Sequence, residues 1–371
     1  MNVLQSENRE KTRTKILFLI PSLRAGGSER VFSVLANHLD REKFDINIVT
    51  LDGSEAFYKI RQEVRLTDLK TPRVRQAVVK IFKLIRAEKP HIVVSTLTHL
   101  NLFLALIKPV LPRKTRFIAR ESTILSAFHA TESHTKLRNL AVKLFYTSFD
   151  LLICQSNQMA TDLEKNYFLP KSRLKTINNP IHTEGVLQGV REGIVTVRNA
   201  QFRFVSIGRL SAEKGLDSAL KALATLENVD FEYLIIGEGK ERTALEQQAA
   251  ALGIADRVVF LGSLKNPFGW LASADLLLLP SHFEGFPNVL LEAGTVGTPA
   301  VAFACGGVSA EIIEDNKTGF VVKDGDTAAL SAAILRGCST VFDRDYIQQQ
   351  TANRFGIAAI LAQFDTTFLT V

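Results

Sequence analysis

Short apolar runs rich in valine, isoleucine and leucine alternate along the chain with stretches of helical periodicity. Because these runs are continuous rather than interrupted by polar residues, they indicate strands buried on both faces, as in parallel sheets covered by helices. The runs are found at 15–20, 45–51, 91–96, 116–121 and 150–155, then at 202–208, 231–237, 257–262, 275–280 and 299–304. This pattern predicts an α/β fold with two successive doubly wound, Rossmann-like sheets.

The division into domains follows from the chain length and from a break in the pattern. A length of 371 residues favours two domains over one. The segment 182–200 lacks a clear period and separates the two series of runs. We therefore predict a first domain over 15–185, a linker over 186–200 and a second domain over 201–348. The polar residues 1–14 are predicted to form a disordered tail.

Composition excludes several classes of protein. Hydrophobic residues make up 46% and charged residues 22%, which excludes disorder as the main state. The cysteines lie far apart without a CxxC pair, so neither a disulfide framework nor a zinc site is expected, and a reducing compartment is the default. These cysteines are Cys154, Cys305 and Cys338. The longest apolar stretch, 100–112, is interrupted and is shorter than the roughly 20 residues of a membrane-spanning helix. The apolar part of 11–20 is too short for a signal peptide.

Charge is distributed unevenly between the two halves. The net charge is +7, yet residues 1–190 hold 30 Lys/Arg and 17 Asp/Glu, a net of +13. Residues 191–371 hold 15 and 21, a net of −6. A basic half joined to an acidic half predicts that one domain faces an anionic surface or polymer. Charge alone leaves nucleic acid and lipid open as that partner.

Polar, glycine-rich loops follow strands in both halves. They occupy 21–30, 208–215, 237–242 and 281–288. Each can be a simple tight turn, but the carboxyl ends of parallel strands meet at one edge of a sheet, where ligands bind. Their accumulation predicts a central cleft between the two domains.

The segment 281–294 carries the strongest motif. Pro287 suits the beginning of a helix, because proline needs no N–H there. The free backbone N–H groups of Asn288 and Val289, together with the positive end of the helix dipole, would then suit a phosphate.

Two carboxylates and two cations accompany this helix. Glu284 precedes it and Glu292 lies inside it. Carboxylates beside a diphosphate repel it unless they bind neutral hydroxyls and cations stand nearby. Arg209 can grip phosphate bidentately and Lys214 adds a point charge. Solvated surface charges are the alternative interpretation.

Gly26 and Gly27 lie between the first predicted strand and helix. The missing side chains would allow close approach to a ligand, although a simple turn is the commoner role. The sequence here is RAGGSER, without G-x-G-x-x-G, so a dinucleotide oxidoreductase ranks low.

Taken together, Gly26-Gly27, GRLSAEKG (208–215) and EGFPNVLLEA (284–293) resemble glycosyltransferase family 4. The resemblance extends from about residue 15 to about 360. It implies the two-domain GT-B fold and a retaining transfer of sugar from a nucleotide-sugar, with a UDP-sugar favoured over a GDP-sugar.

Two features depart from the family pattern. AGTVGTPAVA (293–302) replaces the more usual AMA-x-G-x-P-V-V, and the final helix is short. The family also implies that the last segment, 349–371, returns to pack on the first domain.

The resemblance implies roles for individual residues. Arg209 and Lys214 would bind the donor diphosphate, and Glu284 the hydroxyls of the donor sugar. Glu292 would bind the ribose. The other donor-binding residues would be Gly26, Gly27, Gly208, Gly237, Leu264, Phe286, Asn288 and Val289.

The same charges predict chemistry without a metal or a cofactor. Breaking the anomeric bond puts negative charge on the diphosphate, which Arg209, Lys214 and the helix N-terminus would stabilise. Asp324-Gly325-Asp326 is better interpreted as a turn and helix cap than as a metal site. The departing phosphate is expected to accept the acceptor proton.

Acceptor-side candidates follow strands of the first half. They are His99 after 91–96 and Arg120, Glu121 and Ser122 at the end of 116–121. Relatives acting on polyprenyl-linked sugars carry a similar pair, and Glu121 could orient or deprotonate the acceptor hydroxyl. The alternatives are a strand-end cap for Glu121 and a polar helix-start residue for His99.

The segment 73–87 separates into an apolar and a basic half on a helical wheel. The apolar half would pack on the sheet and leave the basic half free to face anionic lipid. The apolar-then-basic segment 100–116 and the segment 136–146 add to this surface. The sequence contains no nucleic-acid-binding motif, so we expect no nucleic-acid partner.

These observations predict an enzyme at the cytoplasmic, inner face of the cell membrane. It would extend a lipid-linked saccharide in the synthesis of a polysaccharide or glycoconjugate. The alternative is a non-catalytic protein on the same scaffold that binds a nucleotide-sugar or anionic lipid, because a fold does not imply a function.

Overall fold

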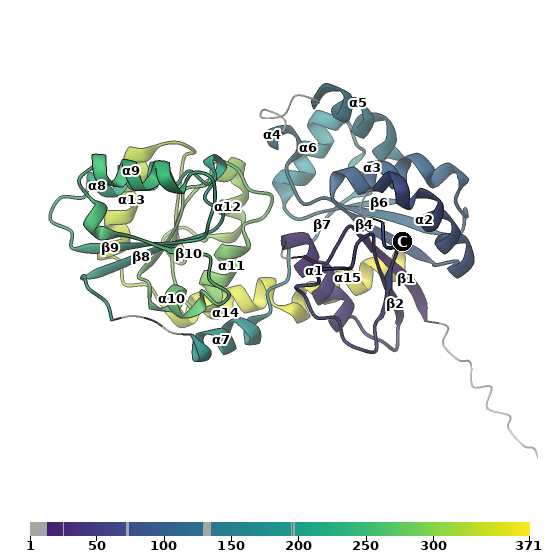
Figure 1. Cartoon of the computed structure of the whole chain (residues 1–371), viewed down its shortest axis with the longest axis horizontal. Coiled ribbons are helices and arrows are strands. Elements are labelled where there is room, and N and C mark those ends of the chain that lie inside the picture. The colour runs from purple at the N-terminus through teal and green to yellow at the C-terminus, as the bar shows by residue number, and fades with distance from the viewer. Residues whose placement is uncertain (1–12, 25, 72–73, 129–134, 194, 196) are drawn as a thin grey trace, which may run out of the picture.

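Two α/β domains lie side by side in the computed structural model, each built on a parallel sheet between helices (Figure 1). The structure describes residues 13–24, 26–71, 74–128, 135–193, 195 and 197–371. The tail expected over 1–14 therefore lies almost entirely outside the described residues, and Thr14 already belongs to the first strand. The predicted fold class is confirmed.

The first domain contains a seven-stranded sheet in the order β3-β2-β1-β4-β5-β6-β7. Its strands are β1 (Thr14–Ile20), β2 (Phe44–Thr50), β3 (Arg65–Asp68), β4 (Ile92–Thr96), β5 (Arg116–Arg120), β6 (Leu151–Cys154) and β7 (Leu174–Thr176). Its helices are α1 (Gly27–His38), α2 (Val74–Glu88), α3 (Thr98–Ile107), α4 (Leu125–Phe128), α5 (Thr135–Phe145) and α6 (Asn157–Tyr167), with 3-10 turns η1 (Lys108–Val110), η3 (Tyr146–Ser148) and η4 (Lys171–Arg173).

The second domain contains a six-stranded sheet in the order β10-β9-β8-β11-β12-β13. Its strands are β8 (Phe202–Ile207), β9 (Phe231–Ile236), β10 (Val258–Gly262), β11 (Leu276–Leu279), β12 (Ala300–Phe303) and β13 (Gly319–Val322). The remaining helices are α7 (Thr183–Glu192), α8 (Leu216–Ala224), α9 (Arg242–Ala251), α10 (Phe268–Ser273), α11 (Asn288–Thr295), α12 (Val308–Ile312), α13 (Thr327–Ser339), α14 (Arg344–Phe355) and α15 (Ile357–Thr370), with η5 (Ala212–Lys214), η6 (Ala255–Arg257) and η7 (Cys305–Gly307).

The strand order reverses direction between β1 and β4 in the first sheet and between β8 and β11 in the second. In doubly wound sheets the loops on either side of such a point separate to opposite faces and leave a crevice. The glycine pair 26–27 and the loops 208–215 and 281–288 follow strands at these two points. The topology therefore positions the predicted ligand loops of both domains at their crevices.

The segment 182–200, expected to lack regular structure, contains helix α7. The helix packs against α10 and α11. Gly189 makes this possible, because a Cβ at that position would lie 2.4 Å from Cδ2 of Phe268. The helix has only ten residues and contains Gly185 and Gly189, which lower its helix propensity, and this is why it was missed.

The C-terminal helix α15 packs in the first domain, against α1. Ile360, Phe364 and Phe368 are buried, and the Phe368 ring contacts the rings of Phe18 and Phe44 edge-on. The chain thus crosses between the domains a second time, through α14 and α15 (Figure 1).

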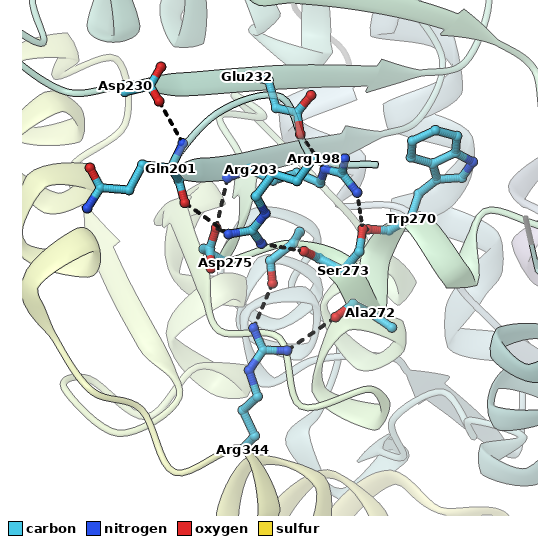
Figure 2. Close-up of polar contacts among 11 residues, drawn as sticks. Arg198, Gln201, Arg203, Asp230, Glu232, Trp270, Ala272, Ser273, Asp275 and Arg344 are labelled. Carbon is cyan, nitrogen blue, oxygen red and sulfur yellow. Dashed lines mark hydrogen bonds and ion pairs between the residues drawn. The ribbon is translucent and has the colours of Figure 1, made fainter. Parts of the chain in front are cut away.

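A buried polar cluster joins the starts of β8, β9 and β11 (Figure 2). Arg203 is 1% exposed, and its Nε donates to Oε1 of Glu232 at 2.7 Å while Nη1 donates to Ser273 Oγ at 2.8 Å. Asp275 accepts from the backbone N–H of Arg203 and pairs with the more exposed Arg198. The cluster lies at the amino ends of these strands, opposite the ligand loops, and so serves the stability of the sheet.

Candidate functional site

A cleft of about 550 Å³ lies between the two domains. Residues from both domains line it, which agrees with the predicted central cleft. Among the predicted site residues, those that line it are Gly27, Ser122, Arg209, Lys214, Glu284, Phe286 and Asn288.

An ion pair lies within this cleft. Lys214 Nζ is 2.6 Å from Oε1 of Glu284, which also accepts a hydrogen bond from Ser281 Oγ at 2.9 Å. Gly215, at φ +59, lets the loop of Lys214 approach the loop of Glu284, since a Cβ there would lie 2.1 Å from the carbonyl oxygen of Pro280. An incoming anion would therefore compete with Glu284 for the ammonium group.

The start of α11 forms one wall of the cleft, with Pro287 as the residue just before the helix. Gly285 brings this wall against the first domain, because a Cβ there would lie 2.1 Å from the carbonyl oxygen of Ser122. Arg209 is exposed in the cleft. A helix N-terminus, an arginine and a lysine thus converge, which is an arrangement suited to phosphate groups.

Glu292 does not line the cleft; it pairs with a residue of the first domain. Its Oε1 lies 2.5 Å from Nη1 of Arg30 on α1. Arg30 follows the glycine pair, and Tyr58 Oη donates to the carbonyl oxygen of Gly26 at 3.0 Å. The role of Glu292 toward a ribose stays a prediction, and its Arg30 partner was missed.

Glu121 differs from its predicted role. Its carboxyl is fully buried and accepts hydrogen bonds from Asn101 Nδ2 at 2.7 Å, from Thr98 Oγ1 at 3.0 Å and from Tyr146 Oη. Burial raises the pKa of the Glu121 carboxyl and of the Tyr146 hydroxyl. Enclosed in this way, Glu121 does not line the cleft, and its contacts fit the strand-end alternative; its role toward an acceptor stays a prediction.

The other acceptor-side candidates, Arg120, Ser122 and His99, do not all lie at the cleft. Ser122 lines the cleft, whereas Arg120 is fully buried behind it. His99 is exposed on α3 and lies outside the lining, and partial desolvation lowers its pKa. Its neighbour Leu97 lines the cleft with φ at +70, an uncommon conformation for a residue other than glycine.

Besides Glu292, five predicted donor-binding residues do not line the cleft: Gly26, Gly208, Gly237, Leu264 and Val289. Gly237, at φ +147, lets the ends of β9 and β8 touch, since a Cβ there would lie 1.8 Å from the carbonyl oxygen of Gly208. Leu264 packs partly buried against the core, as does Val289 on α11. These residues support the loops around the cleft without lining it, so their contact with a donor stays a prediction.

Several residues that line the cleft were not predicted, and two of them follow strands in the way that the predicted residues do. Gln155 directly follows β6, and Asn179 lies shortly after β7. Both therefore stand at carboxyl ends of parallel strands, as the predicted residues do. Neither residue belongs to a motif with a glycine pair or a charged pair, and for this reason the sequence did not predict them as site residues.

Comparison with known proteins agrees with this geometry. Residues 25–184 match the family described as Glycosyltransferase Family 4, and residues 194–351 match the family described as Glycosyl transferases group 1. Both families are glycosyltransferases, and together they span most of the chain: the chain is a glycosyltransferase.

Relatives of this glycosyltransferase align along most of its length. The amylovoran biosynthesis glycosyltransferase AmsD of Erwinia amylovora is 25% identical over 83% of this chain and 85% of that protein. An N-acetylgalactosaminyltransferase of Campylobacter jejuni, named for a diphospho-undecaprenol-linked acceptor, is 28% identical over 85% of this chain and 87% of that protein.

Solved structures show the same GT-B fold. The lipopolysaccharide outer core galactosyltransferase WaaB in its apo form has a TM-score of 0.76 at 20% identity, covering 96% of this glycosyltransferase and 99% of WaaB. Anabaena HepE in complex with UDP and glucose has a TM-score of 0.78 at 21% identity, covering 97% and 100%.

Asp324 and Asp326 of this glycosyltransferase hold backbone groups. The Asp324 carboxylate accepts from the backbone N–H groups of Cys305 and Gly306, at 2.6 and 3.0 Å. Asp326 caps α13 by accepting from the N–H of Ala329. The turn-and-cap interpretation is confirmed. Within the described part of the chain, no group of three His, Cys, Asp or Glu side chains is arranged to hold a metal ion.

Among the described residues, none forms a helix that is both long and apolar enough to span a bilayer.

Proposed function

We propose that this glycosyltransferase moves a sugar, with retention, from a nucleotide-sugar to a hydroxyl of a lipid-linked saccharide during polysaccharide synthesis. UDP is the favoured nucleotide. The observation that carries the proposal is the Lys214–Glu284 pair, set with Arg209 at the start of α11 in a cleft between two domains. The acceptor named for the Campylobacter relative and the UDP bound in HepE support the two substrate classes.

The chemistry follows from charge. When the bond between the anomeric carbon and the diphosphate breaks, negative charge grows on the phosphate oxygens. Lys214 and Arg209 stabilise it, together with the N-terminus of α11, and no metal is needed for that purpose. Glu284, released from Lys214, accepts hydrogen bonds from donor hydroxyls. The departing phosphate takes the proton of the acceptor hydroxyl on the same face of the sugar.

A panel of UDP-, GDP- and ADP-sugars tests this proposal. Each donor is incubated with the chain in the presence of EDTA, and release of the nucleotide is measured. We expect hydrolysis of a UDP-sugar at an undiminished rate, because side-chain cations replace the ion. Activity that disappears in EDTA and returns with magnesium or manganese would contradict metal independence. Nucleotide binding without turnover would favour a non-catalytic protein.

The first domain offers a surface for anionic lipid. On α2, Ala77, Ile81 and Ile85 are buried, whereas Lys83 and Arg86 are exposed. Arg73 lies outside the described residues. On α5, three leucines spaced along one helix face are exposed: Leu137 at 76%, Leu140 at 52% and Leu144 at 60%. Exposed apolar side chains on a strongly basic domain fit a peripheral contact at the inner membrane face.

Flotation with liposomes measures this contact. The chain is expected to float with anionic and less with neutral vesicles, and about 1 M salt should weaken binding only partly. Salt shortens the Debye length from about 10 to about 3 Å, but it leaves inserted leucines in place.

A matched pair of variants locates the contact on the molecule. The double variant Lys83→Glu/Arg86→Glu should lower anionic binding, since each basic residue contributes about 1 kcal/mol near the surface. Lys221→Glu, on α8 of the acidic domain, should not. Equal absence of binding to both vesicle types would favour a soluble acceptor.

A further inference from the structure

Three side chains form a hydrogen-bonded line from the interior of the first domain to the cleft. Arg120, at the end of β5 and fully buried, donates from Nη2 to Oδ1 of Asn179 at 2.5 Å. Asn179 is 2% exposed and donates from Nδ2 to Oδ1 of Asn288 at 2.8 Å, and to Oε1 of Gln155 at 3.2 Å. Asn288 is the first residue of α11, in the second domain.

The chemistry of arginine sets the direction of every bond in this line. A guanidinium has only donors, so Asn179 must turn its oxygen toward Arg120 and its amide nitrogen toward Asn288. Asn288 must then use its oxygen to accept, which leaves its Nδ2 hydrogens for the cleft. Burial lowers the pKa of Arg120 to about 10, so the guanidinium remains charged at neutral pH.

The free end of the line lies where a ligand would bind. Asn288 Nδ2 is 3.4 Å from the position that a Cβ on Gly27 would occupy, and both residues line the cleft. Phosphate oxygens only accept hydrogen bonds, so an amide nitrogen at the helix N-terminus attracts them and an amide oxygen repels them.

The burial of Arg120 is hard to explain by stability alone. Its Nε and Nη1 have no hydrogen-bond partner among the described residues. Buried donors without partners are costly, and an apolar side chain would fill the same space without that cost. A buried guanidinium at this position is explained if its donor-only character fixes the orientation of the Asn179 amide.

We propose that Arg120 and Asn179 are positioning residues that make Asn288 present an N–H donor to the diphosphate of the donor. This inference rests on the proposed function, and it deepens that function by adding the side chain of Asn288 to the phosphate subsite, for which the sequence predicted only its backbone N–H. Neither Arg120 nor Asn179 needs to touch the ligand.

The variant Asn179→Asp should reverse the orientation of the Asn288 side-chain amide. A carboxylate still accepts from Arg120 but cannot donate, so Asn288 must rotate to donate to it and present its oxygen to the cleft. We expect UDP to bind roughly tenfold to hundredfold more weakly by calorimetry, as for loss of a hydrogen bond to a charged group. Uridine, which has no phosphate, should bind as it does to the wild type.

Two further variants distinguish the orientation of the Asn288 amide from the effect of an added negative charge and from a general loosening of the structure. Asn178→Asp adds the same charge one residue away, where the Asn178 side chain donates to the carbonyl oxygen of Gln155 and not to Asn288. It should weaken UDP much less. Asn179→Leu adds no charge and removes the constraint on Asn288, so a several-fold loss for UDP alone is expected, and this variant remains a test if Asn179→Asp fails to fold.

The outcomes distinguish this inference from the proposed function. A wild-type chain that binds no UDP would overturn both. Wild-type UDP binding that Asn179→Asp and Asn179→Leu leave unchanged would overturn only the polarity inference. Equal weakening of UDP and uridine would also overturn it, since that result indicates a structural role.

Discussion

Alanine in place of Lys214 or of Arg209 is expected to slow sugar transfer by a factor of about 10² to 10³. Both cations line the cleft beside the start of α11, where charge grows on the diphosphate in the transition state. The loss at Lys214 has a second cause. Glu284, 2.6 Å from the ammonium, would remain as an unpaired carboxylate facing an anion. Turnover of the donor identified by the sugar panel checks both variants.

The matched control is Lys221→Ala. Lys221 lies on α8, close in sequence to Lys214, but it is exposed and pairs with Asp217 at 3.0 Å. Its removal should leave turnover unchanged, and thermal unfolding should show that all three variants are folded. A near-normal rate in Lys214→Ala or in Arg209→Ala would refute the assignment of the phosphate subsite.

Arg203→Met is expected to lower the free energy of unfolding by about 3–5 kcal/mol. Arg203 and Glu232 are both buried, and their side chains are 2.7 Å apart (Figure 2). Methionine fills much of the volume but leaves the Glu232 carboxylate in the interior without its cation. Chemical denaturation of the full chain measures the change, with donor turnover at low temperature as a check on the site.

Two further variants show whether the unpaired Glu232 carboxylate causes the loss of stability. The double variant Arg203→Met/Glu232→Leu should recover most of the stability, because no charge is then left unpaired. Arg198→Met removes the neighbouring arginine, whose side chain is 36% exposed and pairs with Asp275 at 3.0 Å. It should cost no more than about 1 kcal/mol. A double variant as unstable as Arg203→Met would point instead to lost packing.

The strands that the sequence predicted and those it missed differ in position. Every predicted run became a strand or its direct continuation, and all of these strands except β10 are central ones, which are covered on both faces and are therefore apolar. The missed strands β3, β7 and β13 all lie at sheet edges. Arg65–Asp68 is mostly exposed, so no continuous apolar run marks it.

The site was predicted as far as local motifs extend. The loops of Lys214 and Glu284 were expected together because both follow parallel strands of one sheet, and they form an ion pair. The motifs did not include single polar residues that follow other strands and contribute to the lining of the cleft. Asn179 and Gln155 carry no recognisable pattern, yet they line the same cleft.

The sequence by itself determined the two parallel sheets and the edge at which polar loops gather, since apolar periodicity and strand direction are properties of the local chain. Only the tertiary structure decided which carboxylates face the cleft. Glu121 is enclosed by Asn101 of α3 and Tyr146 of η3, and Glu292 pairs with Arg30 of the other domain. Burial and charge pairing depend on side chains far away in the sequence, so no motif around either glutamate could have revealed its partners.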